Sequence, residues 1–202
     1  MKAYLLIVVL GCLVLAVNAQ GATKPMETIK NLVAAYQGEA NAHERYALFA
    51  KKANEEGFAQ VAKLFRAASR SEQIHRDTHK EAIEKLGGTV PEIVLEKANV
   101  GTTRENLEAA IKGETYERDT MYPEFLKEAR AAKAKPAVRS FTFAHAAEGE
   151  HVKLYKDASD NLGKNAKVDY FVCSVCGNTD TELPAKKCPV CGNPRDKWVQ
   201  ID

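Results

Sequence analysis

The sequence has few aromatic residues and almost no net charge, and both shortages narrow the range of functions. Phe, Trp and Tyr make up 7% of the 202 residues, and the chain is instead rich in Ala, Glu and Lys, which favours helices. The 29 basic residues are nearly balanced by 27 acidic ones, so the positive excess typical of nucleic-acid binding is missing and no nucleic acid is expected as a partner. With 28% charged and 45% hydrophobic residues, the chain is neither a disordered protein nor a membrane protein with several spans.

The longest apolar run lies at the N-terminus. Lys2 precedes the run from Leu5 to Val17, and Val17-Asn18-Ala19 has the small residues of a cleavage site. A basic start, an apolar core and small residues at the cut are typical of a secretory signal. We therefore expect residues 1–19 to be a signal peptide and the protein to be exported, to the periplasm. An uncleaved anchor and a lipoprotein signal at Cys12 are the alternatives, and the cytoplasm is expected if the segment is no signal.

Four amphipathic segments follow, in which apolar residues recur at three- and four-residue steps. The first two are separated by a short Gly-containing turn and are expected to be antiparallel. The third opens with the capping-box sequence Thr102-Thr103-Arg104-Glu105, and Pro123 should kink it. The stretch between Leu86 and Thr102 is long enough to cross the length of a bundle. Four helices with one long connection predict an all-α, ferritin-like four-helix bundle over residues 24–165.

The helical part contains an internal repeat. Gly38-Glu39 in the first half recurs as Gly113-Glu114 in the second. The stretch Glu72-Gln73-Ile74-His75 recurs, at almost the same offset, as Glu148-Gly149-Glu150-His151. Because the two halves present the same polar groups in the same order, we expect a pseudo-twofold axis through a shared centre.

Seven polar residues fall on helix faces that should be buried. A Glu and a His three residues apart lie on one face of a helix, so they aim two ligands at one point. One Glu from each of two helices and a Glu-x-x-His from each of the other two is the ligand pattern of di-iron carboxylate proteins. The set consists of Glu39, Glu72, His75, Glu114, Glu117, Glu148 and His151.

The charge of this set also favours a redox-active metal pair. Five ionised carboxylates in an apolar interior need compensating positive charge. Two ferrous ions bring the same charge as two ferric ions joined by an oxo bridge, so a two-electron change leaves the buried charge unaltered. The alternative interpretation leaves some of the glutamates at the surface and makes the histidines hydrogen-bonded core residues.

Other polar residues near these positions are expected to support the set rather than to bind metal. Three histidines are interpreted as neighbours of the ligands or as ordinary boundary residues: His43, His79 and His145. Four tyrosines are interpreted as core aromatics with a hydrogen-bonded hydroxyl group: Tyr36, Tyr46, Tyr116 and Tyr122.

Segment 168–202 holds a second candidate metal site. Its two Cys-x-x-Cys-Gly motifs offer four thiolates to one tetrahedral ion, and so short a segment needs the metal for its folding energy. Val168–Val172 and Lys197–Ile201 are strand-like and are expected to pair beside the site. The spacing alone leaves iron, zinc and two disulfides open, whereas a neighbouring two-electron centre favours iron. The four ligands are Cys173, Cys176, Cys188 and Cys191.

Together these motifs resemble those of rubrerythrins, in which a ferritin-like di-iron domain (here 24–165) precedes a rubredoxin-like domain (here 168–202). Glu117, beyond the minimal ferritin-like set, is specific to that family. The matching stretches are Gly38-Glu39 with Arg45-Tyr46, Glu72 to His75, Gly113 to Glu117, Met121 to Phe125, Ala147 to His151 and both cysteine motifs.

The resemblance implies a non-haem di-iron peroxidase that reduces hydrogen peroxide to water in defence against oxidative stress. It implies two irons in the bundle, oxo-bridged when oxidised, and one iron at the cysteines, with zinc as the alternative there. Electrons would pass through the rubredoxin-like centre from an unidentified donor, NAD(P)H-linked or other. Between oxidation states, one iron would exchange Glu117 for His75. A homodimer or higher homo-oligomer is also implied, in which the rubredoxin-like centre of one subunit faces the di-iron site of the other.

Two features depart from the family pattern. Most relatives lack an export signal, so the electron donor of an exported protein is left open. Asn178 replaces the aromatic residue that commonly follows the first cysteine motif, and this change bears on the reduction potential of the cysteine centre.

Two other functions remain as alternatives. One is a ferroxidase or iron-handling protein on the same bundle, and the other is a non-catalytic zinc-ribbon interaction module on a structural bundle.

Overall fold

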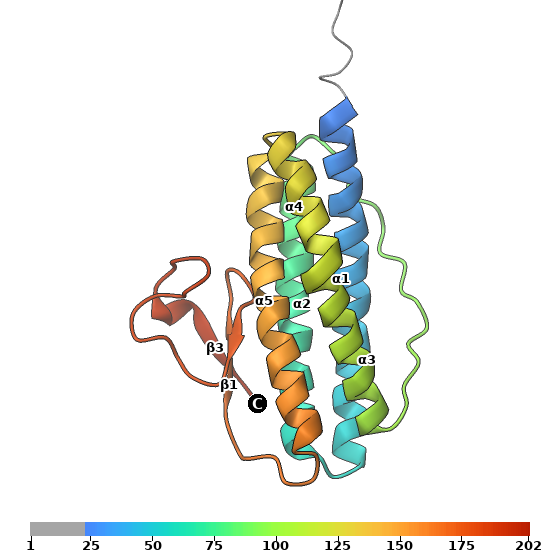
Figure 1. Ribbon diagram of the computed structural model, residues 1–202, viewed down its shortest axis with the longest axis vertical. Helices are drawn as coiled ribbons and strands as arrows, with labels where there is room; N and C mark the ends of the chain where they lie inside the picture. Colours follow the sequence, from blue (N-terminus) through green and yellow to red (C-terminus); the bar gives the residue numbers. More distant parts are fainter. Residues whose placement is uncertain (1–22) are drawn as a thin grey trace, which may run out of the picture.

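The computed structural model describes residues 23–202, which form a long helical bundle with a small sheet packed on its side (Figure 1). A π-helical turn, Glu117–Met121, connects α3 (Thr103–Tyr116) to α4 (Tyr122–Ala131), so these two helices form one rod. The expected four-helix ferritin-like bundle is therefore confirmed. Its helices are α1 (Thr23–Glu55), α2 (Ala59–Lys85), α3 (Thr103–Tyr116), α4 (Tyr122–Ala131) and α5 (Lys135–Asp160).

One tight turn and one long connection set the order of the helices. Gly57, between α1 and α2, has a φ of +83°, a left-handed conformation that glycine adopts without steric cost. The helices it joins are antiparallel, as expected. Residues 86–102 run along the outside of the bundle to the start of α3 (Figure 1). The side-chain amides of Gln37 and Asn41 on α1 hydrogen-bond the backbone of this connection.

The start of α3 and its junction with α4 follow from local chemistry. The Thr102 backbone N–H donates to Glu105 Oε2 at 2.8 Å, and Glu105 N–H donates to Thr102 Oγ1 at 3.3 Å, which is the expected capping box. Pro123 has no backbone N–H and its ring collides with the carbonyl four residues earlier in a regular α-helix. The helix widens just before it, because the Tyr122 N–H donates to Glu117 O, five residues back. The sequence predicted a kink at Pro123, and the structure has a π turn directly before it.

Two apolar clusters fill the bundle on either side of the predicted ligands. Along α1, one cluster includes Leu32 and Tyr36, the other begins at Ala42, and Glu39 lies between them. Each cluster contains residues of α1 and α2, of the rod formed by α3 and α4, and of α5. The polar set is therefore enclosed in the middle of the bundle.

The sheet contains β1 (Tyr170–Cys173), β2 (Thr179–Asp180) and β3 (Trp198–Ile201) in the order β2-β1-β3, with both pairs antiparallel. Cys173 lies opposite Trp198. The predicted pairing of the two strand-like runs is confirmed, with β1 and β3 beginning one or two residues later than expected.

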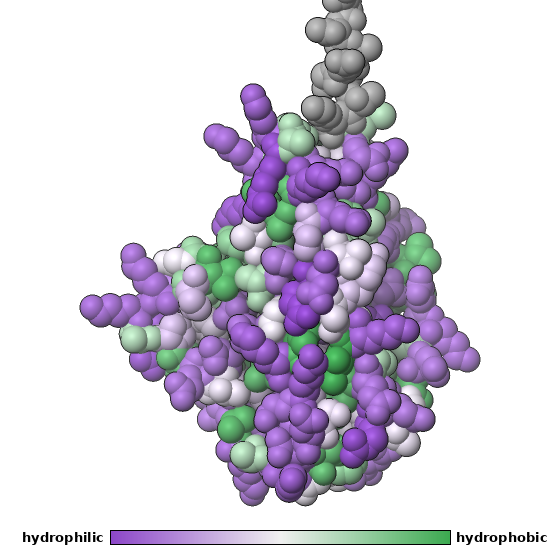
Figure 2. Space-filling view, viewed as in Figure 1, coloured by the Kyte–Doolittle hydropathy of each residue, from purple (hydrophilic) through white to green (hydrophobic). Residues whose placement is uncertain are grey.

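The visible face of the molecule is mainly hydrophilic, and its apolar side chains form small separate patches (Figure 2). Within residues 23–202, none of the helices combines the length and apolar character needed to cross a membrane. The expected signal peptide, residues 1–19, lies outside the described residues.

Candidate metal centres

Six of the seven predicted bundle ligands meet in its middle. They form two groups in which the ligand atoms lie within 4.8 Å of one another. All six side chains are at most 1% exposed. Glu72 and Glu148 belong to both groups, so the arrangement offers two adjacent metal positions that share two carboxylates. One group is Glu39, Glu72, His75 and Glu148, and the other is Glu72, Glu114, Glu148 and His151.

Glu117 lies next to these groups but belongs to neither. It is the first residue of the π turn and is half-buried. Burial and the carboxylates of Glu39 and Glu114 raise the pKa of Glu117 well above its ordinary value. The structure therefore has His75 inside a group and Glu117 outside it, which is one of the two arrangements that the predicted exchange requires. The exchange itself stays a prediction.

The atoms that face the centre of each group suit metal ions. Buried polar atoms in proteins nearly always have hydrogen-bond partners, yet six atoms of this set have none among the described residues. All six are carboxylate oxygens or an imidazole nitrogen, which are ligands that iron accepts. They are Glu39 Oε2, Glu72 Oε1, Glu114 Oε2, Glu148 Oε1, Glu148 Oε2 and His151 Nδ1.

Both histidines of the set turn Nδ1 toward the shared carboxylates. His75 Nδ1 lies 3.3 Å from Glu148 Oε1, and His151 Nδ1 lies 3.0 Å from Glu148 Oε2. On the opposite edge of its ring, His75 Nε2 lies 3.1 Å from Cys176 O, and His151 Nε2 lies 3.2 Å from Thr179 Oγ1. Because a carbonyl oxygen only accepts, His75 carries a proton on Nε2. A metal ion would therefore bind at Nδ1, which in the metal-free chain hydrogen-bonds Glu72 Oε2 at 2.8 Å.

The pKa values describe a site that requires positive charge. Burial and the charge of Glu72 raise the pKa of Glu114 to about 8. Burial also disfavours the charged form of Glu72, but His151 and His75 outweigh it and lower the pKa of Glu72 to about 2. Against the effect of burial, neighbouring carboxylates raise the pKa of both histidines well above the ordinary value. Protons hold these carboxylates together in the metal-free chain, and metal ions displace such protons when they bind.

Two tyrosines hold the outer glutamates in matching ways. Tyr46 of α1 donates to Glu114 Oε1 at 2.5 Å, and Tyr122 of α4 donates to Glu39 Oε1. Both tyrosines are buried, as expected, and each leaves the glutamate's Oε2 facing the cluster. The expectation for Tyr116 was wrong, because its side chain is 58% exposed. It follows Glu114 by two residues, so it points to nearly the opposite side of the helix.

Matching rings around the two tyrosines confirm the pseudo-twofold arrangement that the repeat predicted. Each tyrosine belongs to a trio whose ring centroids lie 5.3–6.0 Å apart. The offset from Tyr46 to Tyr122 is longer by a single position than the offset from Glu39 to Glu114. The additional position falls where the π turn lies, since such a turn accommodates one more residue than a regular turn. The trios are Tyr46, Phe65 and Tyr155 in one half and Tyr122, Phe141 and His79 in the other.

The remaining histidines of the described chain lie outside both groups, as expected. His43 Nδ1 is 2.8 Å from Ser69 O, and His145 Nε2 is 3.0 Å from Arg118 O. His79 is fully buried, and burial lowers its pKa to about 3. Sequence analysis missed the hydroxyl groups that contact the site, such as the Thr179 side chain beside His151, because a single Ser or Thr has no spacing pattern that could reveal it.

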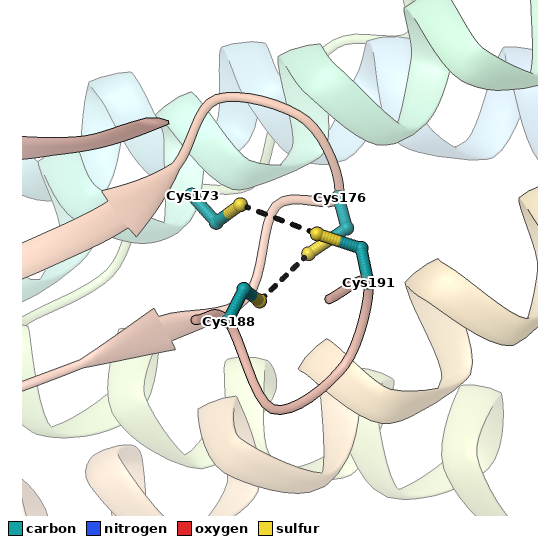
Figure 3. Close-up of side chains that lie close together, drawn as sticks. All are labelled: Cys173, Cys176, Cys188 and Cys191. Carbon is teal, nitrogen blue, oxygen red and sulfur yellow. Dashed lines mark hydrogen bonds between the residues drawn. The ribbon is translucent and has the colours of Figure 1, made fainter. Parts of the chain in front are cut away.

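The four cysteines converge beside the sheet (Figure 3). Cys173 Sγ lies 3.7 Å from Cys191 Sγ, and Cys176 Sγ lies 3.6 Å from Cys188 Sγ. These separations are far longer than a disulfide bond and match the roughly 3.8 Å between sulfurs at the corners of a tetrahedral metal–thiolate site. All four sulfurs lie within 4.8 Å of one another, so the residues fit a single ion.

The cysteine module, residues 168–202, packs directly over His75. Besides the bond from His75 Nε2 to Cys176 O, Ser71 Oγ donates to Gly177 O at 2.6 Å. A Cβ atom on Gly177 would lie 2.3 Å from His75 Nε2, so glycine is required for this approach. One histidine of the bundle site thus touches the backbone of the cysteine site.

This contact is made within one chain, whereas the family resemblance implied a contact between subunits. Segment 161–169 turns back after α5 and runs along α2. Gln60 Nε2 donates to Val168 O at 2.9 Å, and Lys63 Nζ pairs with Asp169 at 2.7 Å. These bonds bring β1 to the side of its own bundle.

The fold and the two centres define a ferritin-like di-iron carboxylate protein that carries a four-cysteine module. The Rubrerythrin family model matches residues 30–159. The chain belongs to the rubrerythrin family. It therefore has the family's di-iron site with carboxylate and histidine ligands and a four-cysteine cluster for a rubredoxin-like iron.

Individual relatives agree with this assignment. Rubrerythrin-2 of Clostridium acetobutylicum is 35% identical over 172 residues, which cover 83% of this chain and 92% of the relative. Nigerythrin of Nitratidesulfovibrio vulgaris is 32% identical over 181 residues, 90% of each chain. A fully reduced, all-ferrous nigerythrin structure superposes with a TM-score of 0.77 over 86% of each chain at 32% identity. A bacterioferritin of Mycobacterium tuberculosis, at 22% identity, has a TM-score of 0.62 over 68% of this chain and 87% of its own, and shares the fold.

Proposed function

We propose that this protein reduces hydrogen peroxide to water at the bundle site and receives electrons through its cysteine centre. The family to which it belongs is di-iron and linked to peroxide and oxidative-stress defence. The observation that carries the proposal is the contact between the two centres, in which His75 Nε2 donates to Cys176 O. A redox centre that touches the ligand of another redox centre suits electron delivery rather than metal storage.

We propose that the six grouped residues hold the two irons and that Glu117 exchanges with His75. Glu72 and Glu148 would contact both metal positions, because each belongs to both groups. Glu39 and Glu114 would each bind through Oε2, the oxygen that the tyrosines leave free. When bound, the two ferrous ions can supply one electron each.

The protein around the metal positions would orient the ligands and exclude bulk water. Tyr46 and Tyr122 fix the rotation of the outer glutamates through buried hydrogen bonds. The apolar clusters on either side of the site keep it dry, which strengthens every electrostatic interaction within it. Glu117, half-buried in the π turn, is the carboxylate that has the most room to move.

Rapid mixing of the reduced, iron-loaded protein with peroxide, and separately with dioxygen, tests this proposal. We expect fast, stoichiometric oxidation by peroxide, followed through the visible spectrum. Much faster oxidation by dioxygen would instead support a ferroxidase, which the bundle it shares with bacterioferritins would permit. Zinc at the cysteines with no iron in the bundle would support a structural protein that carries a zinc ribbon.

We also propose that the protein works outside the cytoplasm, on the basis of residues 1–19 of the sequence. N-terminal sequencing of the protein from a periplasmic fraction should begin at Gln20. A chain that retains Met1 and is found in the cytoplasm would contradict export.

A further inference from the structure

A line of hydrogen bonds leads from Glu39 in the metal site to the side of the bundle. Glu39 Oε1 accepts from the Tyr122 hydroxyl, which lies 3.0 Å from His79 Nε2. His79 Nδ1 lies 2.7 Å from Ser140 Oγ, and Ser140 Oγ lies 3.1 Å from Thr78 Oγ1. Tyr122 and His79 are 0% exposed and Ser140 is 3% exposed. The line therefore runs through the interior and uses α4, α2 and α5.

The outer end of this line opens on a cavity of about 550 Å³ between α2, α5 and the first cysteine turn. Thr78 and Ser140 line the cavity, together with the exposed cations Lys135 and Arg139. Thr78 is only half-buried, so water in the cavity can reach its hydroxyl group. The line thus has one end at solvent and one end at a predicted ligand.

The repeat provides a comparison within the same molecule. In the second half, the Tyr155 hydroxyl that takes the place of His79 has no hydrogen-bond partner among the described residues. The polar neighbour of Tyr46 besides Glu114 is the half-buried Arg45, whose guanidinium only donates and cannot pass a proton on. That half still positions its glutamate and tyrosine in the same way. The polar line is therefore not a requirement of the bundle. The offset that relates Tyr46 to Tyr122 also pairs His79 with Tyr155, Ser140 with Leu64 and Thr78 with Leu154.

Each member of the line can both donate and accept a hydrogen bond. The three hydroxyl groups have one hydrogen each, and a neutral imidazole carries one proton on two nitrogens. The Thr78 hydroxyl also lies 2.9 Å from His75 O, to which it can donate, and it must turn from that carbonyl to Ser140 for the line to point inward. With all hydrogens directed inward, Thr78 then donates to Ser140, Ser140 to His79 Nδ1, His79 Nε2 to Tyr122, and Tyr122 to Glu39. If each donor passes its proton inward, one proton enters from water at Thr78, one arrives at Glu39 Oε1, and every bond reverses. No electron moves.

We propose that Thr78, Ser140, His79 and Tyr122 form a path that carries protons from the cavity to Glu39. The inference rests on the proposed function, because reduction of peroxide consumes protons (H2O2 + 2 e⁻ + 2 H⁺ → 2 H2O) and the buried site must obtain them. His79 and Ser140 touch no reacting atom, so they are positioning residues that act through Tyr122 and Glu39.

Exchange of hydroxyl protons tests the path without measuring activity. The full chain is loaded with zinc in place of iron, its tyrosine rings are labelled with ¹³C, and spectra are recorded in a mixture of light and heavy water. When the hydroxyl hydrogen exchanges quickly with the solvent, the ring carbon that bears the hydroxyl gives one averaged ¹³C signal. When it exchanges slowly, the same carbon gives two signals, one for each hydrogen isotope. We expect one signal for Tyr122 and two for Tyr46, although both hydroxyls are buried and bonded to glutamates.

Two variants remove single links while keeping side-chain size nearly unchanged. Ser140→Ala and Thr78→Val should each convert Tyr122 to two signals and leave Tyr46 as it was. The control is Tyr155→Phe, which removes the unpartnered hydroxyl of the matching half and should change neither tyrosine. Two signals for Tyr122 in the unaltered chain would overturn the path.

Peroxide-driven oxidation of the iron-loaded variants provides the second measurement. Ser140→Ala should slow the oxidation by about 100-fold, the lower end of the range for general acid–base groups, and should leave the iron content unchanged. Tyr155→Phe should not slow the oxidation. An unaltered rate in Ser140→Ala would overturn the path and leave the peroxidase proposal standing. A protein that is inert to peroxide, but whose Tyr122 hydroxyl still exchanges quickly, would support the path and refute the proposed function.

Discussion

At the scale of single residues, the two shared glutamates have a different role from the outer two. Glu72 and Glu148 contribute to both ligand groups, whereas Glu39 and Glu114 each contribute to one. The outer pair is held by tyrosines, and the shared pair lies against the two histidines. Loss of a shared carboxylate should therefore affect both metal positions.

Replacing Glu148 should empty both bundle positions, whereas replacing Glu114 should empty one. In Glu148→Gln, both metals lose a charged ligand and the buried charge that attracts them. We expect iron per chain to fall by two in Glu148→Gln and by one in the matched variant Glu114→Gln, while the visible spectrum of the cysteine centre stays unchanged. Equal losses in the two variants would contradict the sharing of Glu148.

The metal-free protein should lose stability as pH rises from 4.5 to about 8. Burial raises the pKa of Glu114 from 4.5 to about 8 in the folded chain, so over that window the unfolded chain releases this proton and the folded chain keeps it. The unfolded state then binds fewer protons, and the free energy of unfolding falls with pH, by at most about 1.4 kcal/mol per pH unit for one group. The histidines, with raised pKa values, act in the same direction above pH 6.5.

Thermal unfolding of the metal-free protein at several pH values measures this effect. Below pH 4.5 the slope should reverse, because the lowered pKa of Glu72, about 2, makes its stabilising contribution disappear as pH falls. Glu114→Gln should make the slope between pH 4.5 and 8 shallower without abolishing it, because the pKa values of Glu39 and Glu117 are raised as well. A metal-free protein that becomes more stable across that window would contradict the assignment of the proton to Glu114.

At the scale of elements, two turns with the same sequence motif have different surroundings. Gly177 and Gly192 each follow a Cys-x-x-Cys motif and have φ values of +78° and +72°. An added Cβ on Gly177 would meet His75 of the bundle, whereas no atom of the described residues lies within 4 Å of the Cβ position at Gly192. The first turn therefore both holds a metal ligand and makes the contact between the centres.

Gly177→Ala should separate the two centres, whereas Gly192→Ala should not. Both variants incur a backbone cost of about 1–2 kcal/mol for a left-handed alanine, so the second controls for strain in the first. We expect Gly177→Ala to slow electron transfer from the reduced cysteine centre to the oxidised bundle site, measured by rapid mixing. If the two alanine variants transfer electrons at the same rate, the contact at His75 is not the route.

At the scale of the whole molecule, a large helical unit and a small metal-dependent unit share one surface. The apolar cluster of the module is built around its cysteines together with Trp198 and Phe143 of α5. So small a cluster stabilises little by itself. The metal and the bundle together should hold the module in place.

Loss of the cysteine metal should unfold the module and leave the bundle intact. We expect Cys176→Ser with Cys191→Ser to shift the emission of Trp198, the single tryptophan, toward that of an exposed indole, since the side chain is now 8% exposed. The helical circular dichroism and the bundle iron should be unchanged. Unaltered tryptophan emission would show that the module folds without metal.

Much of the fold, and the residues that meet in the candidate site, could be predicted because the signals are local. Apolar period, the capping box at Thr102 and the Glu-x-x-His spacing each depend on residues within one or two helical turns. The two cysteine motifs are local in the same sense. The error at Tyr116 arose because the sequence placed it near Glu114, whereas a two-residue step on a helix turns a side chain away.

The sequence by itself determined which side chains can bind metal and that they occur as two related halves. Only the tertiary structure decided that Glu117 stands aside in a π turn, that the cysteine module rests on His75 of its own chain, and that Ser140 and His79 complete a line of hydrogen bonds to Glu39. The physical reason is range. Spacing along a helix is set by neighbouring residues, whereas contacts among three helices and a sheet depend on how the whole chain packs.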